Sequence, residues 1–299
     1  MKQYIKMGIS IVGMLVILLS IASNFSLSAF AVENHEDEYS VSEYDLITSI
    51  RTMSTDELAD MNLSAKEIEM IRSDSIEKEL LSRKDKTDEA LASRYRYTAE
   101  QISVLRSYNG ERLEDNAELA AITGTLTIAE PTVLVATSTR VGLKVIWSWD
   151  HAPIVCWKDV IAVYWDPTFG SSNGNMRINI ANSSHVVRYY IYSNSTHTLN
   201  WDVTQGSANS AAKSTFAMQD ADQVGWADRG TLTLYFDAAA ESAALTERDF
   251  IFAYGHTILT ISPSVYYPVS GGISFGTATD EADRRSGYVN IARDTRTDN

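Results

Sequence analysis

Alternation of apolar and polar residues with a period of two runs through the chain from Thr123 onward, and it constrains the fold more than any other feature. Leu143, Val145, Trp147 and Trp149 occupy every second position of one stretch. Successive side chains of a β-strand point to opposite faces, so this stretch predicts a strand with one buried face. Alternation recurs in the stretches 126–128, 161–165, 176–180, 199–203, 231–236 and 250–254.

Clusters of Gly, Asn, Ser and Asp separate these short stretches, and strands do not alternate with long helical patterns. Many short strands, each with one polar face, are typical of antiparallel sheets packed face to face. The sequence therefore predicts a mainly β fold. Its expected form is an antiparallel β-sandwich or jelly-roll-like domain over residues 119–292, preceded by a short α-helical segment.

The six tryptophans of the chain divide into two groups by position. One group shares a strand face with apolar neighbours and is expected in the core: Trp147, Trp149, Trp165 and Trp201. The other two, Trp157 and Trp226, fall in expected loops. Because loops on a rigid scaffold commonly carry binding residues, these two are candidate ligand contacts together with Tyr266 and Tyr267.

Residues 32–118 show a different, helical pattern. Three helix starts, at Ser54, Ser64 and Thr98, each have Glu or Gln three positions later, which is the pattern of a capping box. The charged stretch 83–89 between helices is expected to be solvated. Two interpretations of the acidic helical segment stay open: ordinary amphipathic helices, or a helical pair that docks a partner, such as a processed pro-region.

The N-terminus has the order of a secretory signal peptide. Lys2 and Lys6 precede an apolar run over residues 7–22, and Ala29-Phe30-Ala31 supplies an A-x-A cleavage signature. We therefore expect residues 1–31 to be removed near Ala31 and the protein to be secreted, with membrane contact only through the signal segment. Residues 293–299 are expected to form a polar tail.

Charge and cysteine content narrow the range of partners. The chain has 25 Lys and Arg against 39 Asp and Glu, a formal net charge of −14. This acidic balance repels nucleic acid, so no nucleic-acid partner is expected. Cys156 is the only cysteine, so no internal disulfide can form and stability must come from a hydrophobic core.

No motif in the sequence indicates a specific chemistry. Residues 170–174 match G-x-S-x-G, but a strand rather than a helix is expected to follow, so a turn is favoured over a nucleophile elbow. Asp150 and Asp159 are expected at the same end of a hairpin, and with His151 they define an alternative, a secreted hydrolase. Histidines and cysteine lack metal-ligand spacing. We expect no catalytic residues, no metal and no cofactor.

Four further stretches are distinctive: YTAEQISVLR (97–106), YNG (108–110), WSWDHAP (147–153) and FAYGHT (252–257). Together with the A-x-A signal, they resemble a group of uncharacterised secreted proteins of Gram-positive bacteria. The resemblance covers most of the chain after the signal peptide, and it implies export and an all-β C-terminal region. The group has no known activity, so the resemblance implies no catalytic residues.

The sequence thus favours a secreted, non-enzymatic binding or surface-interaction protein, with a glycan or a protein as ligand. A secreted hydrolase that uses the loop carboxylates Asp150 and Asp159 is the alternative. The third candidate is an effector that assembles on membranes, which the serine- and threonine-rich stretch 182–198 permits. The acidic balance disfavours this third candidate because anionic membranes would repel it.

Overall fold

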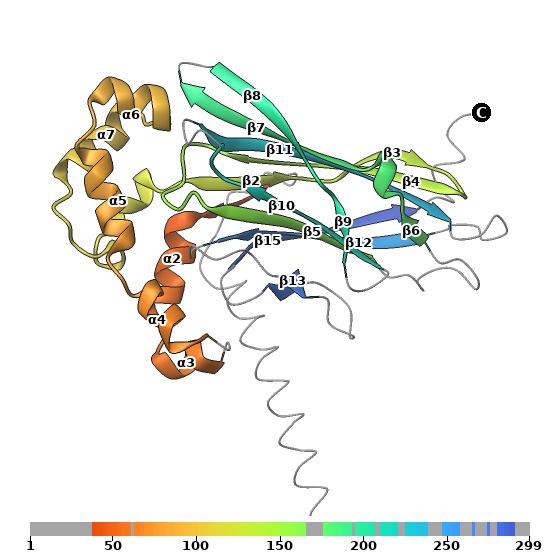
Figure 1. The fold of residues 1–299 in the computed structure, drawn as a ribbon, viewed down its shortest axis with the longest axis horizontal. Coiled ribbons are helices and arrows are strands. Elements are labelled where there is room, and N and C mark those ends of the chain that lie inside the picture. The colour runs from red at the N-terminus through yellow and green to blue at the C-terminus, as the bar shows by residue number, and fades with distance from the viewer. Residues whose placement is uncertain are drawn as a thin grey trace, which may run out of the picture. The chain divides into compact units, whose positions relative to one another are not determined.

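The computed structural model describes residues 38–60, 63–165, 176–192, 195–206, 210–220, 225–238, 247–257, 265–266, 274–275 and 280–290. Residues 37–299 form one compact unit. Within it, two antiparallel sheets are stacked and the helices gather at one end of the stack (Figure 1). The predicted fold class, mainly β with a preceding helical segment, is confirmed.

The first sheet has eight strands, six of which follow the order β1 (Glu38–Ser42), β2 (Thr125–Ala129), β4 (Arg140–Trp149), β11 (Trp226–Ala238), β7 (Ser184–Tyr192) and β8 (Ser195–Trp201). Two more strands join it off this path: β3 (Thr132–Ala136) pairs with β4, and β6 (Met176–Ile178) pairs with β11. All of these pairs are antiparallel.

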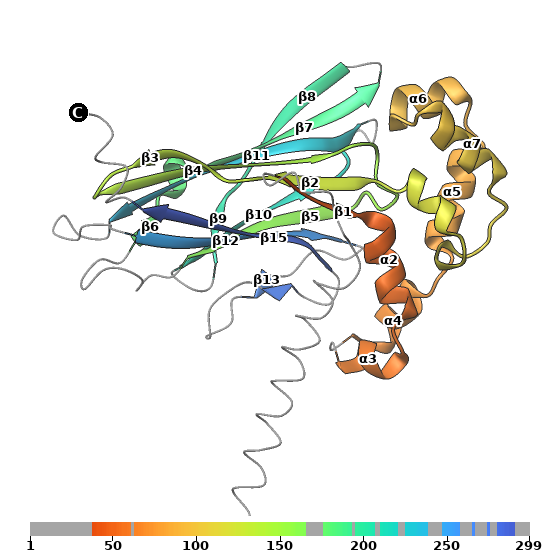
Figure 2. The ribbon, with the colours of Figure 1, turned by 180° about the vertical axis from the view of Figure 1, so that it is seen from behind.

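The second sheet has the order β15 (Asp280–Asn290), β12 (Glu247–His256), β5 (Lys158–Trp165), β10 (Ala211–Ala217) and β9 (Thr204–Gln205). Figure 2 shows the two sheets as layers, with β5, β10 and β12 facing the layer of β4, β7 and β11. A short hairpin of β13 (Val265–Tyr266) and β14 (Ser274–Phe275) forms a third sheet.

Aromatic side chains from both sheets fill the space between the layers. Trp147 of β4 stacks on Phe216 of β10 with 4.9 Å between ring centroids, and Trp165 of β5 meets Phe236 of β11 at the same distance. Trp149 is also buried, as the alternation predicted. Such interdigitation of inward faces is how two sheets form one core.

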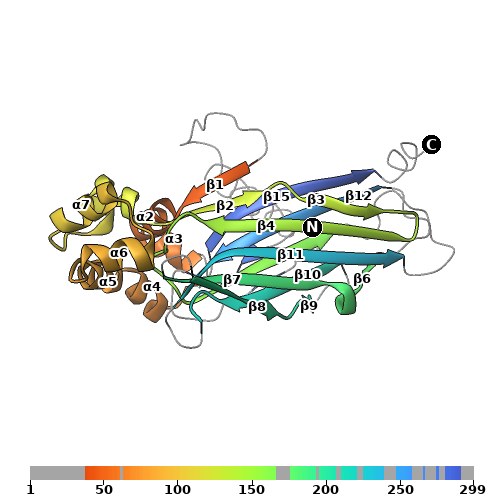
Figure 3. The same ribbon diagram turned by 90° about the horizontal axis from the view of Figure 1, so that it is seen from above.

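The alternation is less reliable at the edge strand β8. Trp201 is only partly buried against the core, and Leu199, expected on the same buried face, is 39 % exposed. In Figure 3, β8 lies at the margin of the first sheet, beyond β7. The expectation for Leu199 was wrong because an edge strand has fewer neighbours to cover its inward face.

Six α-helices in the described residues precede most of the sandwich: α2 (Glu43–Thr52), α3 (Thr55–Asp60), α4 (Ala65–Ile71), α5 (Ser75–Lys84), α6 (Asp88–Tyr95) and α7 (Ala99–Ser107). Short 3-10 helices follow at Leu113–Asp115 and Ala117–Ile122, and a third lies at Ile180–Asn182. The predicted caps are confirmed: Ser54, Ser64 and Thr98 each exchange hydrogen bonds with the residue three positions later.

Strand β1 lies inside the segment that was expected to be helical. It pairs with β2, with Ser42 opposite Thr125, and helix α2 begins directly after it at Glu43. This pairing brings the first turn of α2 to the end of the sandwich. The boundary at residue 118 between a helical segment and a sandwich domain stays a prediction.

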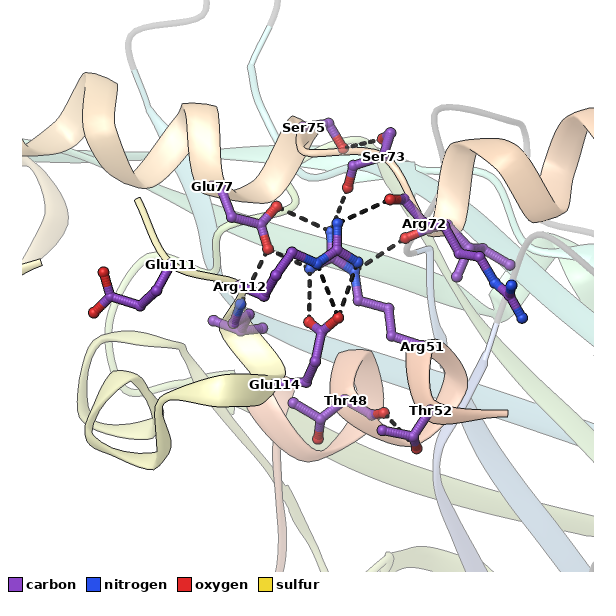
Figure 4. Close-up of polar contacts among 12 residues, drawn as sticks. Thr48, Arg51, Thr52, Arg72, Ser73, Ser75, Glu77, Glu111, Arg112 and Glu114 are labelled. Carbon is purple, nitrogen blue, oxygen red and sulfur yellow. Dashed lines mark hydrogen bonds and ion pairs between the residues drawn. The ribbon is translucent and has the colours of Figure 1, made fainter. Parts of the chain in front are cut away.

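A buried arginine joins three parts of the helical segment. The guanidinium of Arg51 on α2 lies 2.5 Å from a carboxylate oxygen of Glu77 on α5 and 3.1 Å from one of Glu114. It also donates to the carbonyl oxygens of Ile71 and Ser73. Figure 4 shows both carboxylates pointing at this guanidinium. The five donors of one arginine thereby satisfy carbonyls at the end of α4 and its following turn.

Candidate functional site

A cavity of about 350 Å³ lies between helices α4–α6 and the adjacent end of the sandwich. Its other wall is formed by the connection from β4 to β5, by Gln219 and Gly225 between β10 and β11, and by the first residue of β11. The helical side contributes Met70, Ser73, Ser75, Ile76, Glu79, Arg83, Arg94 and Tyr95. The sandwich side contributes Ala152, Ile154, Val155, Cys156, Trp157, Gln219, Gly225 and Trp226.

Two tryptophans line the cavity in different ways. Trp157 is 44 % exposed, and its carbonyl oxygen accepts a hydrogen bond from the Met218 amide at 2.9 Å, so its backbone is fixed while its indole stays open to solvent. Trp226 is 4 % exposed, and its indole N–H donates to the carbonyl oxygen of Arg94 at the end of α6. Trp226 therefore joins the helical segment to the sandwich.

Arg83 is a buried cation in the wall of the cavity. It lies on α5, is 2 % exposed, and donates to the carbonyl oxygens of Ala152 and Pro153 and to the hydroxyl of Tyr97. Its guanidinium also lies 4.6 Å from the centroid of the Tyr95 ring. The prediction that residues 83–89 are solvated was wrong for Arg83, because the guanidinium satisfies carbonyls that no strand or helix reaches.

Glu79 supplies a carboxylate one helical turn before Arg83. One of its oxygens accepts from the Arg83 Nε at 3.0 Å, and its side chain is 42 % exposed. The cavity thus combines aromatic faces, an accessible carboxylate and the polar side chains of Ser75 and Gln219. Pockets with mainly apolar walls and a few placed polar groups are typical small-ligand sites.

Behind the cavity wall lies a fully buried polar network. The ring nitrogens of His256 lie 3.0 Å from a carboxylate oxygen of Asp159 and 3.4 Å from one of Glu43. Burial alone would lower the pKa of His256, but the two carboxylates outweigh it and raise that pKa to about 10. The Tyr254 hydroxyl donates to Asp159 at 2.6 Å. An imidazolium therefore bridges helix α2 and the second sheet.

The structure places the candidate ligand contacts differently from one another. Trp157 lies on a connection, as expected, and Trp226 does not: it begins β11 and is buried, so its predicted position on an exposed loop was wrong. The backbone of Tyr266 lies in β13, its side chain is not described, and Tyr267 lies outside the described residues. That any of the four contacts a ligand stays a prediction. Cavity residues Arg83 and Glu79 were missed.

The carboxylates of the hydrolase alternative are held by separate partners. Asp150 accepts from the amide of Thr125 and lies 2.9 Å from the His151 ring, whereas Asp159 contacts His256, Tyr254 and the amide of Thr257. Asp159 is fully buried in this network rather than a solvated loop acid, and each aspartate is held by its own set of partners. The G-x-S-x-G stretch at 170–174 lies outside the described residues.

In the described part of the chain, no group of three or more His, Cys, Asp and Glu side chains has an arrangement that could hold a metal ion. No helix in the same part is long and apolar enough to cross a membrane.

No protein-family model and no curated protein matches the sequence. Solved structures that it is similar to include a collagen-binding domain from a Staphylococcus aureus adhesin, at 9 % identity, 54 % coverage of this chain and 95 % of that one, and a TM-score of 0.30. Another is ACE19, the collagen-binding subdomain of the Enterococcus faecalis surface protein ACE, at 9 % identity, 54 % coverage of this chain and 94 % of that one, and a TM-score of 0.29. A third is Clostridium perfringens delta-toxin, at 7 % identity, 57 % coverage of this chain and 86 % of that one, and a TM-score of 0.21. Similarities at this level of identity and TM-score support no inference about the function of this chain.

Proposed function

We propose that this protein is a secreted binding protein that holds part of a glycan in the cavity between helices α4–α6 and the sandwich. The observation that carries the proposal is Trp157, which is 44 % exposed in a cavity wall whose neighbouring backbone is held by buried contacts. An aromatic face left open beside polar groups in a cavity suits a ligand contact, because burying it on binding releases water from a large apolar area.

The polar groups of the cavity favour a sugar over an entirely apolar ligand. A pyranose ring presents C–H groups on one face, which suit the electron-rich face of an indole, and hydroxyls around its edge. Glu79 has a partly exposed carboxylate that can accept from hydroxyls, and Gln219 and Ser75 can both donate and accept. A cavity of about 350 Å³ is near the lower limit for ligand pockets, so it suits about one or two sugar rings.

Co-sedimentation of the chain without residues 1–31 tests this proposal, using insoluble peptidoglycan, cellulose and chitin. We expect the parent to bind at least one polymer and Trp157→Ala to bind it at least tenfold more weakly. Tyr192→Ala is the matched control, because Tyr192 is 56 % exposed but does not line the cavity. Equal binding by Trp157→Ala and the parent would place the site elsewhere. A parent that binds none of the polymers would remove the glycan form of the proposal.

A further inference from the structure

The segment Ala152–Trp157 is the part of the cavity wall that carries Trp157, and it belongs to neither a strand nor a helix. Buried backbone groups outside regular structure need other partners. The amide of Ala152 donates to the carbonyl of Tyr95, and the carbonyl of Trp157 accepts from Met218. Between these two ends, side chains from the helical segment bond the amides of Ile154 and Val155 and the carbonyls of Ala152 and Pro153.

Glu43 satisfies the amides of this wall. One of its carboxylate oxygens accepts from the N–H of Ile154 at 2.7 Å, and the other accepts from the N–H of Val155 at 2.8 Å. Glu43 is fully buried, and it is not among the residues that line the cavity. A ligand in the cavity would therefore meet Ile154 and Val155 and not the carboxylate behind them.

Arg83 satisfies the carbonyls of the same wall. Its guanidinium donates to Ala152 at 3.1 Å and to Pro153 at 2.6 Å. A buried anion and a buried cation, carried by α2 and α5, thus fix a segment of six residues through its own backbone. Hydrogen bonds to charged groups are stronger than those between neutral groups, so few contacts suffice to hold it.

His256 keeps the Glu43 carboxylate ionised in this buried position. Burial alone would raise the pKa of Glu43, but the hydrogen bond and charge of His256, with the two amides, outweigh it and lower that pKa below its usual value. Asp159 holds the other side of the His256 ring. The negative charge of Glu43, which binds the amides of the wall, is therefore stabilised by the positive charge of His256 inside the sandwich.

We infer that Glu43 is a positioning residue for the ligand site: through the amides of Ile154 and Val155 it fixes the wall that presents Trp157. The binding part of this inference rests on the proposed function, whereas the effect on the wall does not. Replacing the carboxylate with an amide removes one acceptor oxygen and turns an NH₂ group toward a backbone N–H, so the wall loses at least one of its two bonds.

Glu77 provides a matched control because it is a second buried carboxylate of the helical segment with the same kind of contacts. It pairs with Arg51, as Figure 4 shows, and accepts from the amide of Leu113 at 3.1 Å. It does not line the cavity and does not contact the segment 152–157. Glu77→Gln therefore repeats the chemical change at a different backbone segment.

The experiment measures amide hydrogen exchange in the chain without residues 1–31, for the parent, Glu43→Gln and Glu77→Gln. We expect Glu43→Gln to speed exchange at Ile154 and Val155 at least tenfold and to leave Leu113 within twofold of the parent. Glu77→Gln should give the reverse pattern. Binding to insoluble peptidoglycan, cellulose and chitin should fall at least tenfold in Glu43→Gln only, for each polymer that the parent binds.

Three outcomes would overturn the inference. Glu77→Gln could speed exchange at Ile154 and Val155 as much as Glu43→Gln, which would indicate general loosening. Glu43→Gln could leave these two amides within twofold of the parent. It could also speed their exchange while polymer binding is unchanged, which would separate the wall from the site.

Two provisions keep the test decisive. If Glu43→Gln does not fold, Glu43→Asp replaces it, which keeps the charge but shortens the side chain by one methylene. We then expect exchange at Ile154 and Val155 to rise threefold to tenfold, and an unchanged exchange rate at these amides would contradict the inference. If the parent binds none of the polymers, the glycan proposal fails, and the crossed exchange pattern still decides whether Glu43 fixes the wall.

Discussion

Gly230 and Trp147 face each other across β11 and β4, and the substitution Gly230→Ala tests how the core accommodates its largest side chain. A Cβ atom at position 230 would lie 2.2–2.4 Å from three atoms of the Trp147 indole, far inside van der Waals contact. The indole has nowhere to move, because it is fully buried, stacks on Phe216, and donates to the ring of His185 at 3.1 Å.

The expected loss in the free energy of unfolding of Gly230→Ala follows from these contacts. Overpacking a close-packed core costs roughly 1–3 kcal/mol, and a rigid, fully enclosed indole places this site at the upper end. Displacing the indole also breaks its hydrogen bond to His185, which adds about 1 kcal/mol. A total near 3–4 kcal/mol corresponds to a fall in Tm of about 6–16 °C for a domain of this size, at roughly 2–4 °C per kcal/mol.

Thermal unfolding followed by near-ultraviolet circular dichroism measures this fall. Gly142→Ala is the control: a Cβ there would also be crowded, at 2.8 Å from Tyr235 and Val135, but both side chains are only partly buried and can give way. We expect it to cost less than about 1.5 kcal/mol. A Gly230→Ala protein that melts within 3 °C of the parent, or no lower than Gly142→Ala, would refute the reasoning.

Three further predictions concern buried polar groups. Burial lowers the pKa of His185 to about 3, so stability should decline as pH falls from about 6.5 toward 3, and His185→Gln should flatten that slope in thermal scans between pH 7 and 4. The pKa of His256 is raised to about 10, so its contribution to the free energy of unfolding is complete below about pH 6.5 and is lost as pH rises toward 10. In urea titrations, the free energy of unfolding should therefore change less between pH 6 and pH 9.5 for His256→Gln than for the parent. Trp226→Phe should lower the free energy of unfolding in urea by about 1 kcal/mol, because the indole bond to the Arg94 carbonyl disappears, and an unchanged midpoint would contradict that role.

The sandwich was predictable because its signal is local. A strand in a two-layer sandwich buries every second side chain, so Trp147, Trp149 and Trp165 could be assigned to the core from their neighbours. The capping boxes at Ser64 and Thr98 are equally local, since each involves residues three positions apart. Strand β1 was missed because five residues next to a helix carry little pattern of their own.

The cavity was not predictable because long-range contacts build it. Glu43 meets Ile154, 111 positions later, and His256, 213 positions later. In the sequence, Arg83 belongs to a charged stretch that is expected to be solvated. Only the fold brings the carbonyls of Ala152 and Pro153 next to its guanidinium. Trp157 was the one cavity residue that could be singled out correctly as an exposed aromatic on a connection, because it interrupts the alternation between two strands.

Acrylamide quenching of tryptophan fluorescence reports on the cavity directly, because all six tryptophans lie in described residues and Trp157 is the only exposed one, with Trp201 partly buried and the other four buried. The probe is a soluble muramidase digest of peptidoglycan. We expect the digest to reduce quenching of the parent and to leave quenching of Trp157→Phe unchanged. An equal reduction in both proteins, or no reduction in the parent at digest concentrations that saturate known peptidoglycan-binding proteins, would contradict binding of this polymer in the cavity.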